Sequence, residues 1–344
     1  MIRSPFALAF LCLAGGLHAA PLANLQSKPF GVLLLGAGWD QDWKNALADM
    51  TLKFSPQFPL EFAGGAADVR AIQKAVDRLQ AARIQKLVVV PLYAAAHSPL
   101  MDETRFILGL RQDPAPDFFA AAHSPTGNSL VRRVQFPGKL PGVMTPAPED
   151  HALVVEVLTS RALQLSQDPA HEALVLVGLA PAAGAAREPA PLTTAVPGLR
   201  PPDANEEYQH MLASLAERVR AKGTFRSAHA AVLRPETWLQ ADRERAEEEL
   251  RRMVRELGRS QRVLVIPYAI TGAAAQTPIL HALQGTFMHY NAKGLLPDER
   301  IVRWVGEAVR QGAALPDMRL FKDAGRPLPM PAKSRRLQPL GHRP

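Results

Sequence analysis

Short apolar runs alternate with amphipathic segments along most of the chain. The stretch "VLLLGAGWDQDW" begins with four apolar residues, reaches a glycine-containing turn and continues at Asp40, a residue type that often caps a helix. This pattern predicts a strand at Gly31–Leu35 and a helix at about Asp40–Lys53. A second strand is expected near Pro59–Ala63, and a second helix at Ala67–Arg83.

The next segment, "IQKLVVVPLY", is a continuous β-branched run with polar residues at its start. Such runs between helices are typical of a parallel sheet that is covered on both faces. In "HSPLMDETRFILGLR", Ser98 fits a helix N-cap and Pro99 fits the first helical position. Further along, a strand is expected around Leu140–Met144 and a helix at about Glu149–Leu165.

The same order of patterns then restarts. "EALVLVGLAP" (Glu172–Pro181) is similar to "FGVLLLGAGW", and "QRVLVIPYAITG" (Gln261–Gly272) is similar to "QKLVVVPLYAAA", including the proline after the valines. "QTPIL" (Gln276–Leu280) is similar to "HSPLM", which predicts that a helix begins there too. Helices are also expected at about Asp203–Gly223 and Asp242–Leu257.

We interpret this repetition as an internal duplication. It predicts an α/β protein of two doubly wound units with mostly parallel sheets, at residues 23–167 and 168–315. The Pro- and Arg-rich residues 316–344 are expected to form a tail.

The first 22 residues resemble a secretory signal peptide. Arg3 supplies a positive start, Phe6–Leu13 form a short apolar core, and small residues follow. The protein is therefore expected to be exported, either periplasmic or secreted, with an uncleaved N-terminal anchor as the alternative. No later segment has the length of a membrane span.

Composition excludes several classes of site. Cys12 is the only cysteine of the 344 residues and lies within the signal, which excludes disulfides, thiolate nucleophiles and sulfur metal sites from the mature chain. The formal net charge is +8, which favours either an anionic ligand or merely a solvated basic surface. No segment resembles a nucleic-acid-binding module.

A strand that ends in G-x-G, a later "VVVPL" strand and a histidine six residues after its proline together resemble the class II tetrapyrrole chelatases. These are the sirohydrochlorin cobaltochelatases and ferrochelatases, in their two-domain form. The resemblance covers nearly the whole mature chain. It implies two chelatase-like units with a tetrapyrrole bound in the cleft between them, and a divalent metal, cobalt or iron, handled by two histidines.

The resemblance places the first histidine at Ala37, where this chain has none, and the second at His97, which is present. In the second unit the turn position is Leu179. His97 is therefore the candidate metal ligand and the candidate catalytic base, since neutral imidazole can bind a metal and accept a proton. A single histidine holds a metal weakly without further ligands.

Four other residues are candidates for contacts with the ligand. Arg105 could pair with the carboxylates on the rim of a tetrapyrrole, or lie on a solvated helix face. His123, His281 and His289 could each ligate a tetrapyrrole metal axially, or be surface or packing residues.

Two leading functions stay open at this point, with a structural or scaffolding role and an empty cleft as a weaker third. One is an active chelatase, a lyase that inserts cobalt or iron into a sirohydrochlorin-like ring. The other is a non-catalytic periplasmic carrier of a tetrapyrrole, a corrinoid or a metal. Ala37 and the expected export favour the second. The expected partner is a tetrapyrrole small molecule, and the chain is expected to be a monomer or a homodimer.

Overall fold

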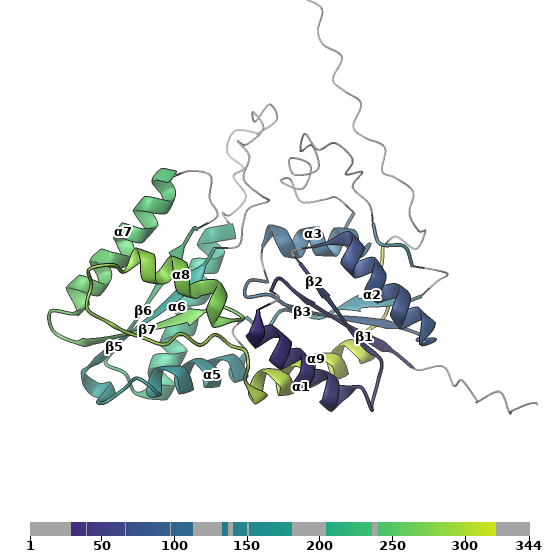
Figure 1. Cartoon of the computed structure of the whole chain (residues 1–344), viewed down its shortest axis with the longest axis horizontal. Coiled ribbons are helices and arrows are strands. Elements are labelled where there is room, and N and C mark those ends of the chain that lie inside the picture. Colours follow the sequence, from purple (N-terminus) through teal and green to yellow (C-terminus); the bar gives the residue numbers. More distant parts are fainter. Residues whose placement is uncertain are drawn as a thin grey trace, which may run out of the picture.

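The computed structural model describes residues 29–38, 40–65, 67–96, 98–112, 133–136, 140–149, 151–180, 204–235 and 240–320. These residues form two α/β units that lie side by side (Figure 1). Each unit is built around a parallel sheet, as the sequence predicts.

The first sheet has the strand order β2-β1-β3-β4, with all neighbouring strands parallel. Its strands are β1 (Gly31–Gly36), β2 (Leu60–Gly64), β3 (Leu87–Leu92) and β4 (Gly142–Met144).

The second sheet repeats this order as β6-β5-β7-β8, again with parallel neighbours. Its strands are β5 (Glu172–Leu179), β6 (Ser227–Leu233), β7 (Arg262–Tyr268) and β8 (His289–Tyr290).

The duplication extends to the pairing of individual residues. In the first sheet Pro91 is paired with Leu35, one residue before Gly36. In the second sheet Pro267 is paired with Val177, one residue before Gly178. The predicted internal duplication is therefore confirmed at the level of strand register.

Helices cover both faces of each sheet. In the described residues they are α1 (Gln41–Phe54), α2 (Val69–Ala81), α3 (Pro99–Ile107), α5 (Ala152–Leu163), the 3-10 turn η1 (Pro169–His171), α6 (Ala204–Gly223), α7 (Gln240–Leu257), α8 (Gly272–Ala282) and α9 (Glu299–Ala314).

Alternate residues of each central strand belong to different apolar clusters. Val32 and Leu34 of β1 are buried under α1 and α9, whereas Leu33 and Leu35 are buried under α2 and α3. This is the side-chain alternation of a strand with both faces covered. Burying one such aliphatic side chain contributes about 1.5–3 kcal/mol, so that these two faces account for much of the stability of the unit.

Two helices are exchanged between the units. Helix α5 follows β4 of the first sheet but packs against α6 and β7 of the second unit. Helix α9 follows the second sheet but packs against α1, β3 and β4 of the first, where it is visible in yellow-green beside the purple α1 (Figure 1). A chain boundary near residue 167 thus separates the sheets but not all the helices that cover them. One apolar cluster runs continuously through both units.

The predicted helix start at "QTPIL" is wrong. Helix α8 begins at Gly272, with Thr271 at the N-cap, and Pro278 lies inside the helix. A Cβ at position 272 would lie 1.7 Å from the backbone oxygen of Ala292. The glycine therefore permits a close backbone approach that sets the start of the helix, and the proline does not mark it.

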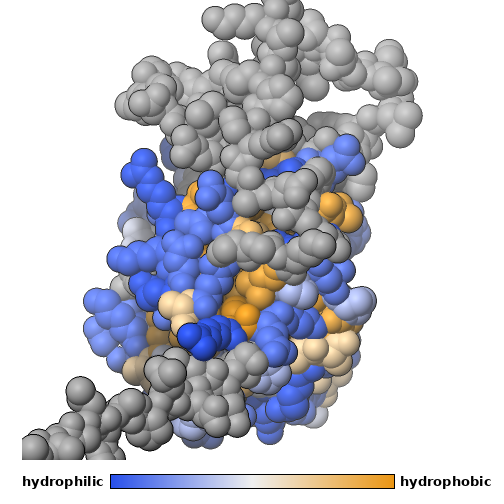
Figure 2. Space-filling model, turned by 90° about the vertical axis from the view of Figure 1, so that its right-hand side faces the viewer, coloured by the Kyte–Doolittle hydropathy of each residue, from blue (hydrophilic) through white to orange (hydrophobic). Residues whose placement is uncertain are grey.

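The surface is largely hydrophilic on the face shown in Figure 2, where apolar side chains gather in a limited area. Among the described helices, none is long and apolar enough to cross a membrane.

Candidate functional site

A direct hydrogen bond joins the carboxyl edges of the two sheets. Asp40 follows β1 and Thr271 follows β7, and the Thr271 Oγ1 donates to Asp40 Oδ2 at 2.6 Å. The other oxygen of Asp40 accepts from the backbone N–H of Trp43 at 3.0 Å and so caps α1. Ligands of open parallel sheets collect at carboxyl edges. We therefore take this junction as the candidate site.

The glycine turn after β1 has a packing role. A Cβ at Gly36 would lie 2.3 Å from the indole of Trp43, and a Cβ at Gly38 would lie 2.0 Å from it. Trp43 itself is buried beneath the turn. Ala37, between the two glycines, is exposed. The turn thus presents a methyl group at the position where the resemblance places a histidine.

The turn after β5 repeats this arrangement with a tyrosine. A Cβ at Gly178 would lie 2.6 Å from the Tyr208 hydroxyl oxygen. Leu179 ends the strand half-buried, and the next residue, Ala180, donates its N–H to Leu233 O at 2.8 Å. The Tyr208 hydroxyl is buried without a hydrogen-bond partner among the described residues, and burial raises its pKa.

A second contact between the units involves Glu149, which lies between β4 and α5. The hydroxyl of Tyr268, at the end of β7, donates to the backbone oxygen of Glu149 at 2.9 Å. The Glu149 carboxylate in turn accepts from the backbone N–H of Ala96 at 3.0 Å. Glu149 has a φ of 33°, a value that non-glycine residues rarely adopt. Nothing in the local sequence pattern indicates this role.

Two of the predicted site residues, His97 and His123, lie outside the described residues. The neighbours of His97 are described. Ala96 follows the carboxyl end of β3, and Ser98 caps α3 as predicted, accepting from Met101 N at 3.3 Å.

Arg105 lies half-exposed on α3. Its guanidinium pairs with Asp102 at 3.1 Å, and Arg111 pairs with the other oxygen of the same carboxylate. One carboxylate therefore faces two guanidinium groups.

The structure places His281 and His289 away from the carboxyl edges. His281 lies near the end of α8, exposed, with Glu247 at 3.8 Å. It is ten residues beyond Thr271, or about 15 Å along the helix axis. His289 is paired with Leu264, four residues before the end of β7 at Tyr268 and thus about 13 Å from that edge. The described residues contain no group of three His, Cys, Asp or Glu side chains that could hold a metal.

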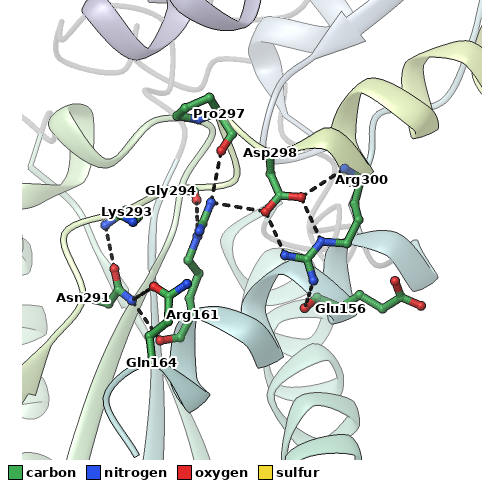
Figure 3. Close-up of polar contacts among 9 residues, drawn as sticks. All are labelled: Glu156, Arg161, Gln164, Asn291, Lys293, Gly294, Pro297, Asp298 and Arg300. Carbon is green, nitrogen blue, oxygen red and sulfur yellow. Dashed lines mark hydrogen bonds and ion pairs between the residues drawn. The ribbon is translucent and has the colours of Figure 1, made fainter.

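A second group of polar contacts, which we call the crossover cluster, links the exchanged helices α5 and α9 (Figure 3). Arg161 of α5 donates to the backbone oxygens of Gly294 at 3.3 Å and Pro297 at 3.2 Å, and it pairs with Asp298 at 3.4 Å. Asp298 caps α9 and also receives two hydrogen bonds of 2.8 Å from the Arg300 guanidinium.

The charges of the crossover cluster are nearly removed from water, with 7% of the Arg161 side chain and 10% of the Asp298 side chain exposed. Burial alone would raise the pKa of the Asp298 carboxyl. The hydrogen bonds from Arg300 and the charges of Arg300 and Arg161 outweigh burial and hold this pKa below its ordinary value. No motif or local pattern in the sequence indicates that Arg161 and Asp298 form this cluster.

The described surface also has pockets along the helices. One of about 590 Å³ is lined mainly by α5 residues together with Lys222 and Arg300. Another of about 550 Å³ lies between α1 and the start of α9, beside Leu52 and Pro297. Both flank the crossover cluster and not the junction at Asp40 and Thr271.

The junction at the carboxyl edges offers hydrogen-bonding groups that are already engaged. Both oxygens of Asp40 and one oxygen of Glu149 accept hydrogen bonds within the protein. The role of these polar groups in the described residues is therefore to hold the backbone after β1 and β3 in position.

No protein-family model and no curated protein sequence matches this chain. Among solved structures it is similar to SirB from Bacillus subtilis, solved with Fe3+, at 12% identity and a TM-score of 0.50, covering 83% of this chain and 96% of SirB. It also matches DR2241 from Deinococcus radiodurans, a multi-domain protein described as structurally similar to chelatases, at 14% identity and a TM-score of 0.43, covering 86% of this chain and 56% of DR2241. The chain therefore has a chelatase-like fold.

Proposed function

We propose that the chain binds a tetrapyrrole, or a divalent cobalt or iron ion, where the carboxyl edges of its two units meet. The observation that carries this proposal is the direct bond between Thr271 and Asp40, because it joins the edges where parallel sheets collect ligands. The likeness of the fold to SirB, a sirohydrochlorin ferrochelatase, supports the choice of ligand.

We further propose that metal insertion by this chain is weak or absent. His97 is the one histidine that the resemblance places at the site, and Ala37 stands where the second is expected. Two imidazoles would bind a metal far more tightly than one, and each tenfold in affinity corresponds to about 1.4 kcal/mol. If the chain does insert a metal, it is a lyase of the chelatase type.

The proposal is tested on the mature chain from residue 23. Absorption spectra are recorded with sirohydrochlorin, haem and cobalamin, and Co2+ is titrated into the natural chain and into Ala37→His. We expect Ala37→His to bind Co2+ at least about tenfold more tightly, because it restores the second imidazole. Leu52→His is the matched control, since position 52 is 80% exposed and lies on the far part of α1.

Insertion of cobalt into sirohydrochlorin is measured in parallel. We expect the natural chain to insert cobalt at close to the uncatalysed rate. Insertion well above that rate, together with no effect of Ala37→His on affinity, would show that the site is intact and the proposal of weakened metal chemistry wrong.

A non-catalytic carrier in the periplasm is the second candidate, and the exposed alanine at position 37 favours it. The two functions differ in one result. A carrier would change the spectrum of a tetrapyrrole on binding and leave its metal content unaltered, whereas a chelatase would convert the metal-free ring to the metal complex.

A further inference from the structure

Glu149 is held from both units at once. Its backbone oxygen accepts from Tyr268 of the second sheet, and its carboxylate accepts from Ala96, which follows β3 of the first sheet.

On the first-unit side, Glu149 fixes the backbone next to His97. Ala96 is buried, and its N–H donates to Glu149 Oε1 at 3.0 Å. On the other side of position 97, Ser98 Oγ donates to Ala95 O at 3.2 Å. The second bond lies within the connection between β3 and α3, whereas the first comes from a residue more than 50 positions away. Glu149 therefore links the segment between β3 and α3 to a distant part of the chain.

On the second-unit side, the donor Tyr268 is fully buried. Its ring lies 6.3 Å from the ring of Tyr208. Its hydroxyl reaches the backbone of Glu149 at 2.9 Å. A φ of 33° is unfavourable for a residue other than glycine, and such a conformation at Glu149 persists only where surrounding contacts hold it.

We propose that Glu149 is a positioning residue that couples the contact between the two units to the backbone that carries His97. When Tyr268 holds the Glu149 backbone, the carboxylate lies where it receives the Ala96 N–H. Loss of the Tyr268 bond therefore weakens the bond to Ala96 as well. The coupling itself is inferred from the two hydrogen bonds alone. Its effect on ligand binding rests on the proposed function.

Amide hydrogen exchange of the full mature chain tests the coupling. Exchange is read on peptides spanning Leu92–Ser98 in Glu149→Ala, Glu149→Gln and Tyr268→Phe. Losing one hydrogen bond of about 1.4 kcal/mol raises exchange at Ala96 about tenfold, and this is expected for Glu149→Ala. Glu149→Gln keeps an acceptor oxygen and is expected to stay within about threefold of the natural chain. Tyr268→Phe, which leaves Glu149 and Ala96 unaltered, is expected to raise exchange by about threefold or more.

Thr271→Val is the matched control. It removes a hydrogen bond between the units, the one to Asp40, without touching Glu149. If it raises exchange at Ala96 as much as Tyr268→Phe does, or if Tyr268→Phe has no effect, the coupling through Glu149 is wrong. Circular dichroism verifies that each variant is folded. Tyr268→Phe decides the question even if Glu149→Ala does not fold.

Co2+ binding by Ala37→His then shows whether the contacts of Glu149 affect metal binding at the site. Adding Glu149→Ala is expected to weaken Co2+ binding about tenfold, and adding Glu149→Gln about threefold or less. Equal losses for both would mean that the Glu149 charge acts directly on the metal, which contradicts a positioning role. Absence of Co2+ binding in every form would reject the metal-binding part of the proposed function and leave the exchange result to decide the coupling.

Discussion

The two units share their packing but differ in their polar groups. In the first, Trp43 lies beneath the glycine turn that follows β1, and in the second, Tyr208 lies beneath the turn that follows β5. The prolines of β3 and β7 occupy the same register position in their sheets. The apolar framework has therefore been kept in both copies.

The polar groups that start the helices after β3 and β7 behave differently. Ser98 caps its own helix by accepting from Met101 N at 3.3 Å. Thr271, at the equivalent N-cap of α8, makes no such cap, and its hydroxyl donates to Asp40 of the first unit. The polar N-cap residue of the second unit thus bonds across the junction, whereas that of the first unit stabilises its own helix.

The aromatic residues beneath the turns should contribute equally to the free energy of unfolding in both units. Trp43 and Tyr208 are 2% and 3% exposed. Trp43→Ala and Tyr208→Ala each leave a large cavity and should lower the free energy of unfolding by about 4 kcal/mol. Urea denaturation measures both. A difference of more than about 2 kcal/mol between them would show that the duplicated packing is not energetically equivalent.

The exchanged helices should depend on the crossover cluster. Arg161→Leu leaves Asp298 with Arg300 as its remaining partner and deprives two backbone oxygens of their donor. We expect a loss of about 3 kcal/mol in unfolding free energy.

Arg303→Ala is the matched control for Arg161→Leu. Arg303 is 55% exposed and lies 3.6 Å from Glu156, so that its loss should cost less than about 1 kcal/mol. Equal effects of the two substitutions would contradict a structural role for the buried pair.

The contribution of Asp298 should depend on pH in a defined direction. Its folded pKa lies below the unfolded value near 3.9, so the charged carboxyl stabilises the fold above that pH. This stability is lost as the pH falls through the folded pKa. Asp298→Asn should cost about 2 kcal/mol at pH 7, and the difference from the natural protein should shrink below about pH 4.

The matched substitution for this experiment is Asp168→Asn, at a carboxylate with 62% of its side chain exposed. Unfolding free energies of all three proteins are compared from pH 7 to pH 3. A cost of Asp298→Asn that stays constant over this range would mean that ionisation of Asp298 does not stabilise the fold.

The sequence is a good guide to the parts of the fold that local patterns determine. The strands β1, β3, β5 and β7 are continuous apolar runs, and Asp40 and Ser98 are capping residues directly before helices. The missed elements have weaker local signals. β6 is an alanine-rich edge strand, and β8 has two residues that are defined by their pairing with Leu264 and Val265. Helix α9 was missed although Asp298 at its N-cap and its periodic apolar residues indicate it.

The candidate site was less predictable, because its contacts join distant parts of the chain. The partner of Glu149 is 119 residues away, and Arg161 reaches a backbone oxygen 136 residues away. Neither residue belongs to a motif, and each role depends on how the exchanged helices pack. The resemblance indicates the turn at Ala37. The hydrogen bond between Asp40 and Thr271, which joins this turn region to the second unit, is visible only in the three-dimensional structure.

The smallest expected effects on stability come from removing the hydroxyl groups of two tyrosines in the second unit. Tyr268 and Tyr208 lie together at the end of the second sheet, but only the Tyr268 hydroxyl has a described acceptor, the backbone oxygen of Glu149. Tyr268→Phe should therefore cost about 1 kcal/mol, because it leaves that carbonyl without its donor. Tyr208→Phe removes a buried hydroxyl without a partner among the described residues, and should leave the unfolding free energy unchanged or raise it by up to about 1 kcal/mol. Because both substitutions remove one oxygen from a buried ring, the difference between them measures the hydrogen bond across the junction. If Tyr208→Phe is the more destabilising of the two, the Tyr208 hydroxyl bonds to a group outside the described residues, and the second unit has a polar contact at its own turn.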